Sequence, residues 1–140
     1  MTTSLNSSVT AKEIGYGVVQ TLIKKITFAD YATTVTVGKI PAYSHVIGGG
    51  VHVVTGFNSS GTDLIDMGYI GSTTVVAAYA SALSMAAVGL IAFDDLATTT
   101  NIMQTVETTI TATPTQSVAD ATAGEAYIIV QYVTQYLRTS

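Results

Sequence analysis

Residues 43–57 alternate between two sets of side chains over a length that an extended strand accommodates. Successive side chains of a strand point to opposite faces of a sheet, so every second residue shares a face. The predicted core face consists of Tyr43, His45, Ile47, Gly49, Val51, Val53, Thr55 and Phe57. Residues 48–50 are three consecutive glycines, which indicate a β-bulge, a bend or a close approach of another backbone within this strand.

Strand-like segments of the same kind recur along the chain and are separated by turn residues. The further predicted strands are 18–28, 33–37, 64–70, 85–93, 103–113 and 125–137. Residues 72–84 are predicted to hold a short helix or a loop. Pro41 and Pro114 are predicted to end strands, because proline has no N–H to donate to a sheet. About eight short strands indicate an all-β fold, a two-sheet antiparallel β-sandwich of jelly-roll size.

The predicted last strand is apolar on both faces. One face presents Ala126, Ile128, Val130 and Tyr132, and the other presents Tyr127, Ile129, Gln131 and Val133. A strand of this kind is covered on both sides. We expect the core of the domain to cover one face and another body, such as a second subunit, to cover the other.

Charged side chains are scarce. Five Lys plus Arg and nine Asp plus Glu make up 10% of 140 residues, against about 25% in a typical soluble domain. The hydrophobic content of 48% excludes a disordered protein, and the absence of Cys excludes a disulfide scaffold and thiol chemistry. A net charge of −4 argues against nucleic-acid binding. So few charges leave uncharged surface, which usually marks contact with a partner.

The chain is predicted to form one domain, residues 15–140, preceded by a short N-terminal arm, residues 1–14. The arm is polar and aperiodic, and it lacks the basic and apolar regions of a secretory signal. Residues 75–93 are apolar enough to raise the question of a membrane span. They are rich in small residues and lie between acidic residues rather than basic ones, so we predict no membrane segment.

Catalytic and metal-binding patterns are not evident. There is no Gly-x-Ser-x-Gly nucleophile motif and no acidic calcium-loop run. His45 and His52 are seven residues apart, which places them on opposite faces of a strand unless a bulge intervenes. The acidic pairs, expected to cap turns or face solvent rather than catalyse, are Asp63 with Asp66 and Asp94 with Asp95. We therefore predict that the chain is not an enzyme and has no metal or other cofactor.

The candidate partner contacts are two lysines and three tyrosines. Lys24 and Lys25 form the only basic pair and serve either as a partner contact or, as we prefer, as protection of an edge strand against stray pairing. Tyr127, Tyr132 and Tyr136 fall on the last predicted strand. Tyrosine is favoured at interfaces, and placement of these residues in the core is the alternative.

Two segments resemble structural proteins of tailed bacteriophages. They are residues 37–68, with Ile40-Pro41-Ala42, the glycine-containing strand, the polar Asn58-Ser-Ser-Gly61 loop and Ile65-Asp-Met-Gly68, and residues 121–132, Ala-Thr-Ala-Gly-Glu-Ala-Tyr-Ile-Ile-Val-Gln-Tyr. The pattern is similar to that of the jelly-roll cement (decoration) proteins of phage capsids. This chain departs from it at Tyr43-Ser44, where a glycine often follows Pro-Ala.

The resemblance implies a non-enzymatic structural virion protein on the outer surface of the capsid, assembled in the host cytoplasm. Its implied partners are the major capsid protein and copies of itself, as dimers or trimers at symmetry positions, whose contacts hold neighbouring capsid subunits against the pressure of packaged DNA. The resemblance carries over no site residues.

Three alternatives remain open. One is another phage structural part: a tail, fibre or head–tail connector subunit. A second is a carbohydrate-binding β-sandwich in which Tyr16, Tyr31 and Tyr43 form a stacking platform. A third is a small cupin-like metalloenzyme, for which the two histidines are too few.

Overall fold

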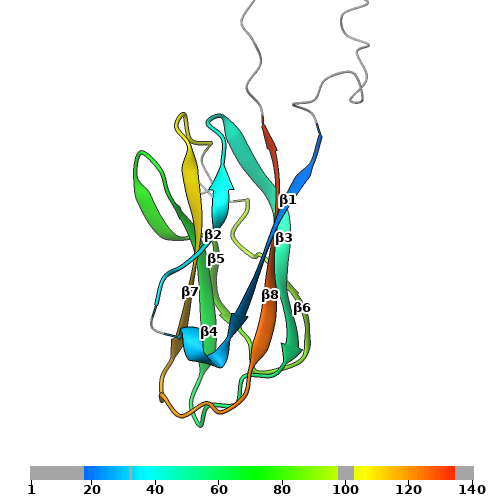
Figure 1. The fold of residues 1–140 in the computed structure, drawn as a ribbon, viewed down its shortest axis with the longest axis vertical. Helices are drawn as coiled ribbons and strands as arrows, with labels where there is room; N and C mark the ends of the chain where they lie inside the picture. Colours follow the sequence, from blue (N-terminus) through cyan, green and yellow to red (C-terminus); the bar gives the residue numbers. More distant parts are fainter. Residues whose placement is uncertain (1–17, 32, 98–102, 135–140) are drawn as a thin grey trace, which may run out of the picture.

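The protein is described by a computed structural model that covers residues 18–31, 33–97 and 103–134. These residues form two four-stranded antiparallel sheets packed face to face, together with one short 3-10 helix (Figure 1). The predicted all-β sandwich is therefore confirmed.

Sheet A has the strand order β1-β8-β3-β6, and sheet B has the order β2-β7-β4-β5. The strands in chain order are β1 Gln20–Thr27, β2 Val35–Ile40, β3 Ser44–Thr55, β4 Asp63–Ile70, β5 Thr74–Ser84, β6 Gly89–Ala92, β7 Thr108–Gln116 and β8 Glu125–Thr134. The 3-10 helix η4, Phe28–Asp30, directly follows β1.

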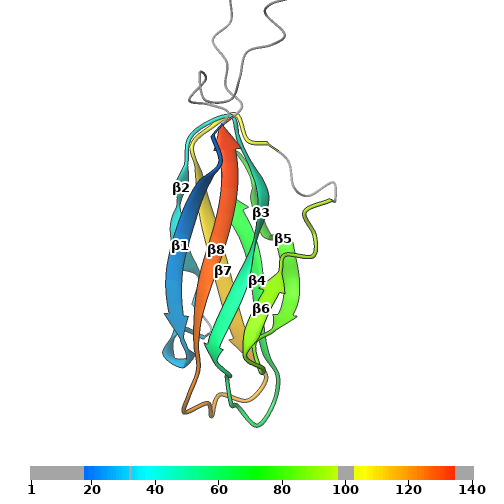
Figure 2. The same cartoon turned by 90° about the vertical axis from the view of Figure 1, so that its right-hand side faces the viewer.

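The strand pairing is that of a long hairpin rolled onto itself. The first strand pairs with the last, β2 pairs with β7, β3 with β6 and β4 with β5, all antiparallel. Further pairings of β3 with β8 and of β4 with β7 close the two sheets. Eight strands in this order make a jelly roll, and Figure 2 shows both sheets running the length of the molecule.

Alternating side chains of both sheets fill the core. Along β8, Ala126, Ile128, Val130 and Tyr132 are buried, so of the two faces predicted for this strand theirs is the inner one. From sheet B, β4 contributes Ile65, Met67 and Tyr69. Each such large apolar side chain stabilises the fold by about 1.5–3 kcal/mol when fully buried.

A bulge at residue 47 changes which face of β3 is buried. Val46 pairs with Tyr132 and Gly48 with Gln131, so Ile47 is an extra residue with no partner in β8. A one-residue shift moves all side chains on one side of the bulge to the opposite face. The predicted core face is therefore right for Val51, Val53 and Phe57. It is wrong for His45 and Ile47, in whose place Ser44 and Val46 point inward.

The predicted helix at 72–84 is wrong, because these residues form β5. The segment is rich in alanine, but its pairing with β4 buries Ala78, Tyr79 and Ala80 in the core, and such tertiary contacts override helix propensity. From Met67 to Tyr69, β4 advances by two residues, whereas the paired part of β5, from Ala80 to Val75, spans a step of five residues. The additional residues of β5 form a large bulge here.

Two further strand boundaries differ from expectation. Pro114 lies inside β7 and pairs with Ile65 rather than ending the strand. The neighbouring strand β2 stops pairing at Val35, opposite Ala112, so that side of β7 is open where proline lacks its N–H. The strand predicted over 85–93 is shorter, since β6 spans Gly89–Ala92.

The lower end of the molecule in Figure 1 carries the loops 56–62 and 117–124, which are hydrogen-bonded to each other. Asn58 accepts bonds from the N–H groups of Thr122 and Ala123, and Asp120 accepts one from Ser60 at 2.8 Å. These bonds hold the two loops together. The predicted arm, residues 1–14, lies outside the described residues. Within the described part of the chain, no helix has the length and apolar character needed to cross a membrane.

Candidate interaction surfaces

Charge is distributed unequally between the two sides of the sandwich. The strands β1 and β2 are edges of their sheets and lie together on one side, whereas β5 and β6 are the edges on the other side (Figure 2). Lys24, Lys25 and Lys39, on β1 and β2, are the lysines among the described residues. In contrast, residues 67–93, which include all of β5 and β6, carry no charged side chain.

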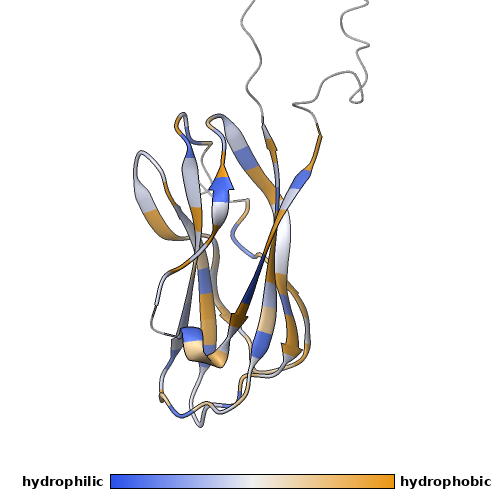
Figure 3. Cartoon of the chain, in the orientation of Figure 1, coloured by the Kyte–Doolittle hydropathy of each residue, from blue (hydrophilic) through white to orange (hydrophobic). Residues whose placement is uncertain are grey.

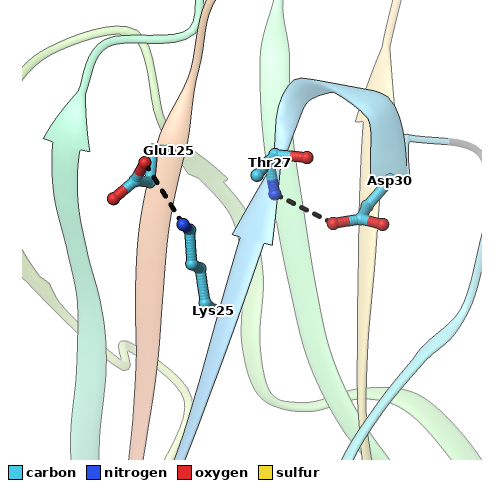
Figure 4. A network of polar contacts seen from close by, with 4 residues as sticks. All are labelled: Lys25, Thr27, Asp30 and Glu125. Carbon is cyan, nitrogen blue, oxygen red and sulfur yellow. Dashed lines mark hydrogen bonds and ion pairs between the residues drawn. The ribbon is translucent and has the colours of Figure 1, made fainter.

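An ion pair and a hydrogen bond between a backbone N–H and a carboxylate lie at the end of β1, on the side of the sandwich that carries the lysines. The Nζ of Lys25 lies 3.6 Å from Oε1 of Glu125 on β8, and the N–H of Thr27 donates to Oδ2 of Asp30 at 2.9 Å (Figure 4). Both partners of the ion pair are substantially exposed, so it contributes at most about 1 kcal/mol. The arrangement orders this edge rather than stabilising the fold as a whole.

The two adjacent lysines point to opposite faces of sheet A. Lys25 pairs with Tyr127 and points outward, whereas Lys24 pairs with Ile128, whose side chain belongs to the core face. A charged side chain on the inner face of an edge strand opposes pairing with another sheet. The position of Lys24 thus favours the interpretation as edge protection, and Lys25 belongs to the outward face.

The outward face of sheet A carries a row of paired side chains across all four strands, with Tyr127 and His52 at its centre. Tyr127 on the central strand β8 pairs with Lys25 on one side and with His52 on the other, and His52 in turn pairs with Leu90 of β6. The next row is apolar, with Ile129 between Ile23 and the side-chain-free Gly50. Figure 3 shows hydrophobic colour on β8 and β6. Tyr127 and Ile129 are only half-buried, as expected for a strand apolar on both faces.

The other candidate tyrosines that the structure describes lie outside this row. Tyr132 is 7% exposed, and its hydroxyl donates to Oε1 of Gln20 at 2.7 Å, so it is a core residue. Tyr136 lies outside the described residues, as does Tyr16. Tyr31 precedes β2 and Tyr43 follows it, which puts them at opposite ends of the strand, and the predicted tyrosine platform is wrong.

Exposed apolar side chains gather beside β6. We define the apolar margin as Val54, Val88 and Leu90, on β3 and β6 and in the loop before β6. Val88 and Leu90 are the most exposed large hydrophobic residues of the described chain, at 69% and 68%. The sequence pattern does not reveal this margin, because the apolar run at residues 85–93 predicts a core strand. The sequence feature that could have indicated the margin is the absence of charged residues around Gly89.

The histidines do not form a metal site. Because the bulge at Ile47 adds one residue between them, His45 and His52 both point outward, which is the exception that the sequence left open for a bulged strand. Their partners on β8, Val133 and Tyr127, are six residues apart, or about 20 Å along a strand. Among the residues that the structure describes, no three His, Asp or Glu side chains are grouped so that they could hold a metal ion.

The acidic residues accept backbone hydrogen bonds at turns and bulges, as expected. Asp63 accepts from the N–H of Ser59 at 3.2 Å, and Asp66 accepts from the N–H of Ala82 at 2.7 Å. Asp94 accepts from the N–H of Ser81 at 3.3 Å. Hydrogen bonds from Ser60 lower the pKa of the exposed Asp120 carboxyl. These carboxylates therefore stabilise the backbone of nearby turns and bulges.

Comparison with known proteins gives matches of structure only. No protein-family model and no curated protein sequence matches this chain. A chain in the acidic stable capsid structure of Helicobacter pylori bacteriophage KHP30 has a TM-score of 0.63 and 13% identity, covering 83% of this chain and 87% of that one. A chain in the cyanophage Pam1 capsid asymmetric unit has a TM-score of 0.62 and 18% identity, covering 82% and 84%. At these identities the similarity establishes a shared fold.

Proposed function

We propose that this chain is a structural protein of a phage virion that binds the outer surface of the capsid and cements neighbouring major capsid protein subunits. The observation that carries the proposal is the fold. Two phage capsid structures contain chains of the same fold, and each match covers more than four fifths of both chains. The function is proposed by analogy of fold, and the surface of this chain supplies the independent support.

The surface has the character of one that neighbours cover. One side of the sandwich is free of charge over residues 67–93, and the apolar margin adjoins it. The outward face of sheet A adds Tyr127 and Ile129 on its central strand. Exposed apolar surface of this kind usually marks an interaction site, and a capsid lattice provides such neighbours at every copy.

The proposed partners are the major capsid protein and further copies of this chain at symmetry positions. Lys25 and Tyr127 are the proposed partner contacts that lie on one outward face. The N-terminal arm, residues 1–14, is proposed as an additional contact. The proposed location is the outside of the virion, with assembly in the host cytoplasm, and the role requires no catalysis or cofactor.

A tail, fibre or connector subunit is the alternative within the same class. A carbohydrate-binding module is less well supported, because Tyr31 and Tyr43 lie at opposite ends of β2. Copy number separates the first alternative from the cement role. A cement protein is present in icosahedral numbers, whereas a connector or tail subunit forms one ring or fibre per virion.

The test is binding to shells assembled from the major capsid protein of the same phage. Purified full-length chain is mixed with shells and sedimented, and bound copies are counted by densitometry. Saturable binding at an icosahedral copy number, with shells that survive a higher temperature when coated, supports the proposal. Absence of binding to intact shells overturns it. A chain without residues 1–14, bound as well as the full chain, removes the arm from the contact.

A further inference from the structure

The lower end of the sandwich contains a group of buried polar atoms that lack hydrogen-bond partners. They are Oγ of Ser59, Oδ1 of Asp63 and both amide atoms of Gln116. Asp63 is only 2% exposed. Buried polar atoms are nearly always satisfied in folded proteins, so an unsatisfied set in one place indicates a bound species.

Strand pairing and one hydrogen bond bring the three residues together. Asp63 and Gln116 are directly opposite each other at the ends of β4 and β7. Ser59 is held beside Asp63, because its N–H donates to Oδ2 of that carboxylate at 3.2 Å. The carbonyl oxygen of Asp63 accepts from the N–H of Met85 at 2.9 Å, so the chain after β5 packs against the same residue.

Among the described residues, no lysine or arginine lies on the strands around the Asp63 carboxylate. The strands β4, β5 and β7 carry no Lys or Arg, and the lysines of the described residues lie on β1 and β2. A buried carboxylate is costly unless it is paired with a positive charge or coordinates a metal ion. A water molecule alone would satisfy hydrogen bonds here and would leave the negative charge uncompensated.

We propose that Ser59, Asp63 and Gln116 bind one Ca²⁺ ion. Hydroxyl, carboxylate and amide oxygens are the hard ligands that Ca²⁺ prefers, and its coordination is tolerant of irregular geometry. Mg²⁺ demands near-ideal octahedral geometry, and zinc sites use histidine and cysteine ligands, which are absent here. Waters complete the coordination shell and accept the amide hydrogens of Gln116. This inference does not depend on the proposed function.

The site has one carboxylate and therefore differs from the acidic calcium loop sought in the sequence. A low ligand charge gives weak binding, with a dissociation constant of about 10⁻⁴–10⁻³ M, as in extracellular calcium modules. The bound ion would join the 56–62 loop to the ends of β4 and β7. It would therefore reinforce the end where Asn58 and Asp120 already tie the two loops together.

The experiment measures thermal unfolding of the full chain in about 5 mM CaCl₂ against NaCl and MgCl₂ of matched ionic strength. The expected result is a rise in Tm of about 3–6 °C with CaCl₂ alone. Asp63→Asn should lose this rise. The matched control is Asp120→Asn, which removes an exposed carboxylate at the same end and should keep it.

A wild-type Tm that is the same in CaCl₂ and matched NaCl overturns the proposal. Equal calcium responses of wild type and Asp63→Asn also overturn it. If Asp63→Asn fails to fold, equilibrium dialysis of the wild-type protein with radioactive calcium decides the matter. About one ion bound per chain supports the site, and no bound ion rejects it in favour of an internal water.

Discussion

Oδ1 of Asp66 on β4 accepts a hydrogen bond of 2.7 Å from the N–H of Ala82, which has a positive φ of 54° on β5. Ala82 lies where the three-residue step from Leu83 to Ala80 faces a two-residue step of β4, so the carboxylate anchors a bulge on an edge strand. Bulged edges resist pairing with other sheets, which protects a strand that has no charge of its own.

Asp66→Ala is expected to lower the free energy of unfolding by about 1 kcal/mol. The substitution removes the acceptor of a charge-assisted hydrogen bond whose donor is partly open to water. Urea denaturation followed by far-UV circular dichroism measures the loss. The control is Glu107→Ala, whose carboxylate reaches only Lys39 at 4.0 Å on an exposed surface. Equal losses in both variants would contradict a specific role of Asp66.

Ala82→Gly is expected to stabilise the protein by about 1 kcal/mol, opposite in sign to the usual effect of glycine in a strand. A positive φ is costly for alanine and free for glycine, so the gain comes from relieved backbone strain. Ala77→Gly on the same strand, where φ is not positive, should destabilise and serves as the comparison. The same urea titration measures the free energy of unfolding of both variants. A lower free energy of unfolding for Ala82→Gly than for the wild type would show that the backbone at this position is not strained.

Much of the fold could be predicted from alternation and turn residues, because most strands have one buried face. The β-sandwich and the two faces of β8 required only that pattern, whereas the residues of β5 are predicted to hold a short helix or a loop. The glycines at 48–50 indicate a bulge, a bend or a close backbone approach in this strand, but the position of the bulge at Ile47 could not be predicted, since Val46 and Ile47 are both apolar and either one suits the core. Their choice is decided by the register with β8, a partner far away in the sequence.

The candidate surfaces likewise combine features that alternation predicts with features that only contacts between distant strands decide. The regular alternation of the last strand predicts that Tyr127 and Ile129 share one apolar face, but it does not decide whether that face is the outer one. Leu90 was missed, because a leucine in a short apolar segment is usually buried. Its exposure results from the position of β6 at the edge of sheet A, where β6 pairs only with β3. Which strands become edges is a property of the whole topology.

Gly49→Ala is expected to destabilise the protein by about 3 kcal/mol or more. Gly49 has a φ of 132°, and an added Cβ would overlap the carbonyl oxygen of Ile129 and the ring of Phe93. Gly89→Ala is the matched control, because Gly89 also has a positive φ but open space around its Cα. Comparison of the two losses in thermal unfolding separates crowding from strain. Similar losses would indicate that crowding at Gly49 is relieved by movement of β8.

Stability is expected to fall as the pH rises above about 10. Burial, and to a lesser degree the nearby Tyr69, raises the pKa of Tyr79. The unfolded state therefore loses the Tyr79 proton at a lower pH than the folded state does. The contribution of Tyr79 to the free energy of unfolding is complete below about pH 10 and decreases above it, by up to about 1.4 kcal/mol per pH unit. Tyr79→Phe should flatten this alkaline decline in urea titrations from pH 8 to 11. An unchanged decline in the variant would show that other groups cause it.

Leu90→Lys is expected to weaken binding to capsid shells at least tenfold while leaving the fold intact. Leu90 is 68% exposed in the apolar margin, so lysine costs the monomer little. In a covered interface the same lysine would bury a charge without a partner, which is strongly unfavourable. Thr36→Lys, exposed on edge strand β2 beside Lys39, provides the matched control. Cosedimentation with shells measures both affinities, and equal binding of Leu90→Lys and wild type would place the contact elsewhere on the molecule.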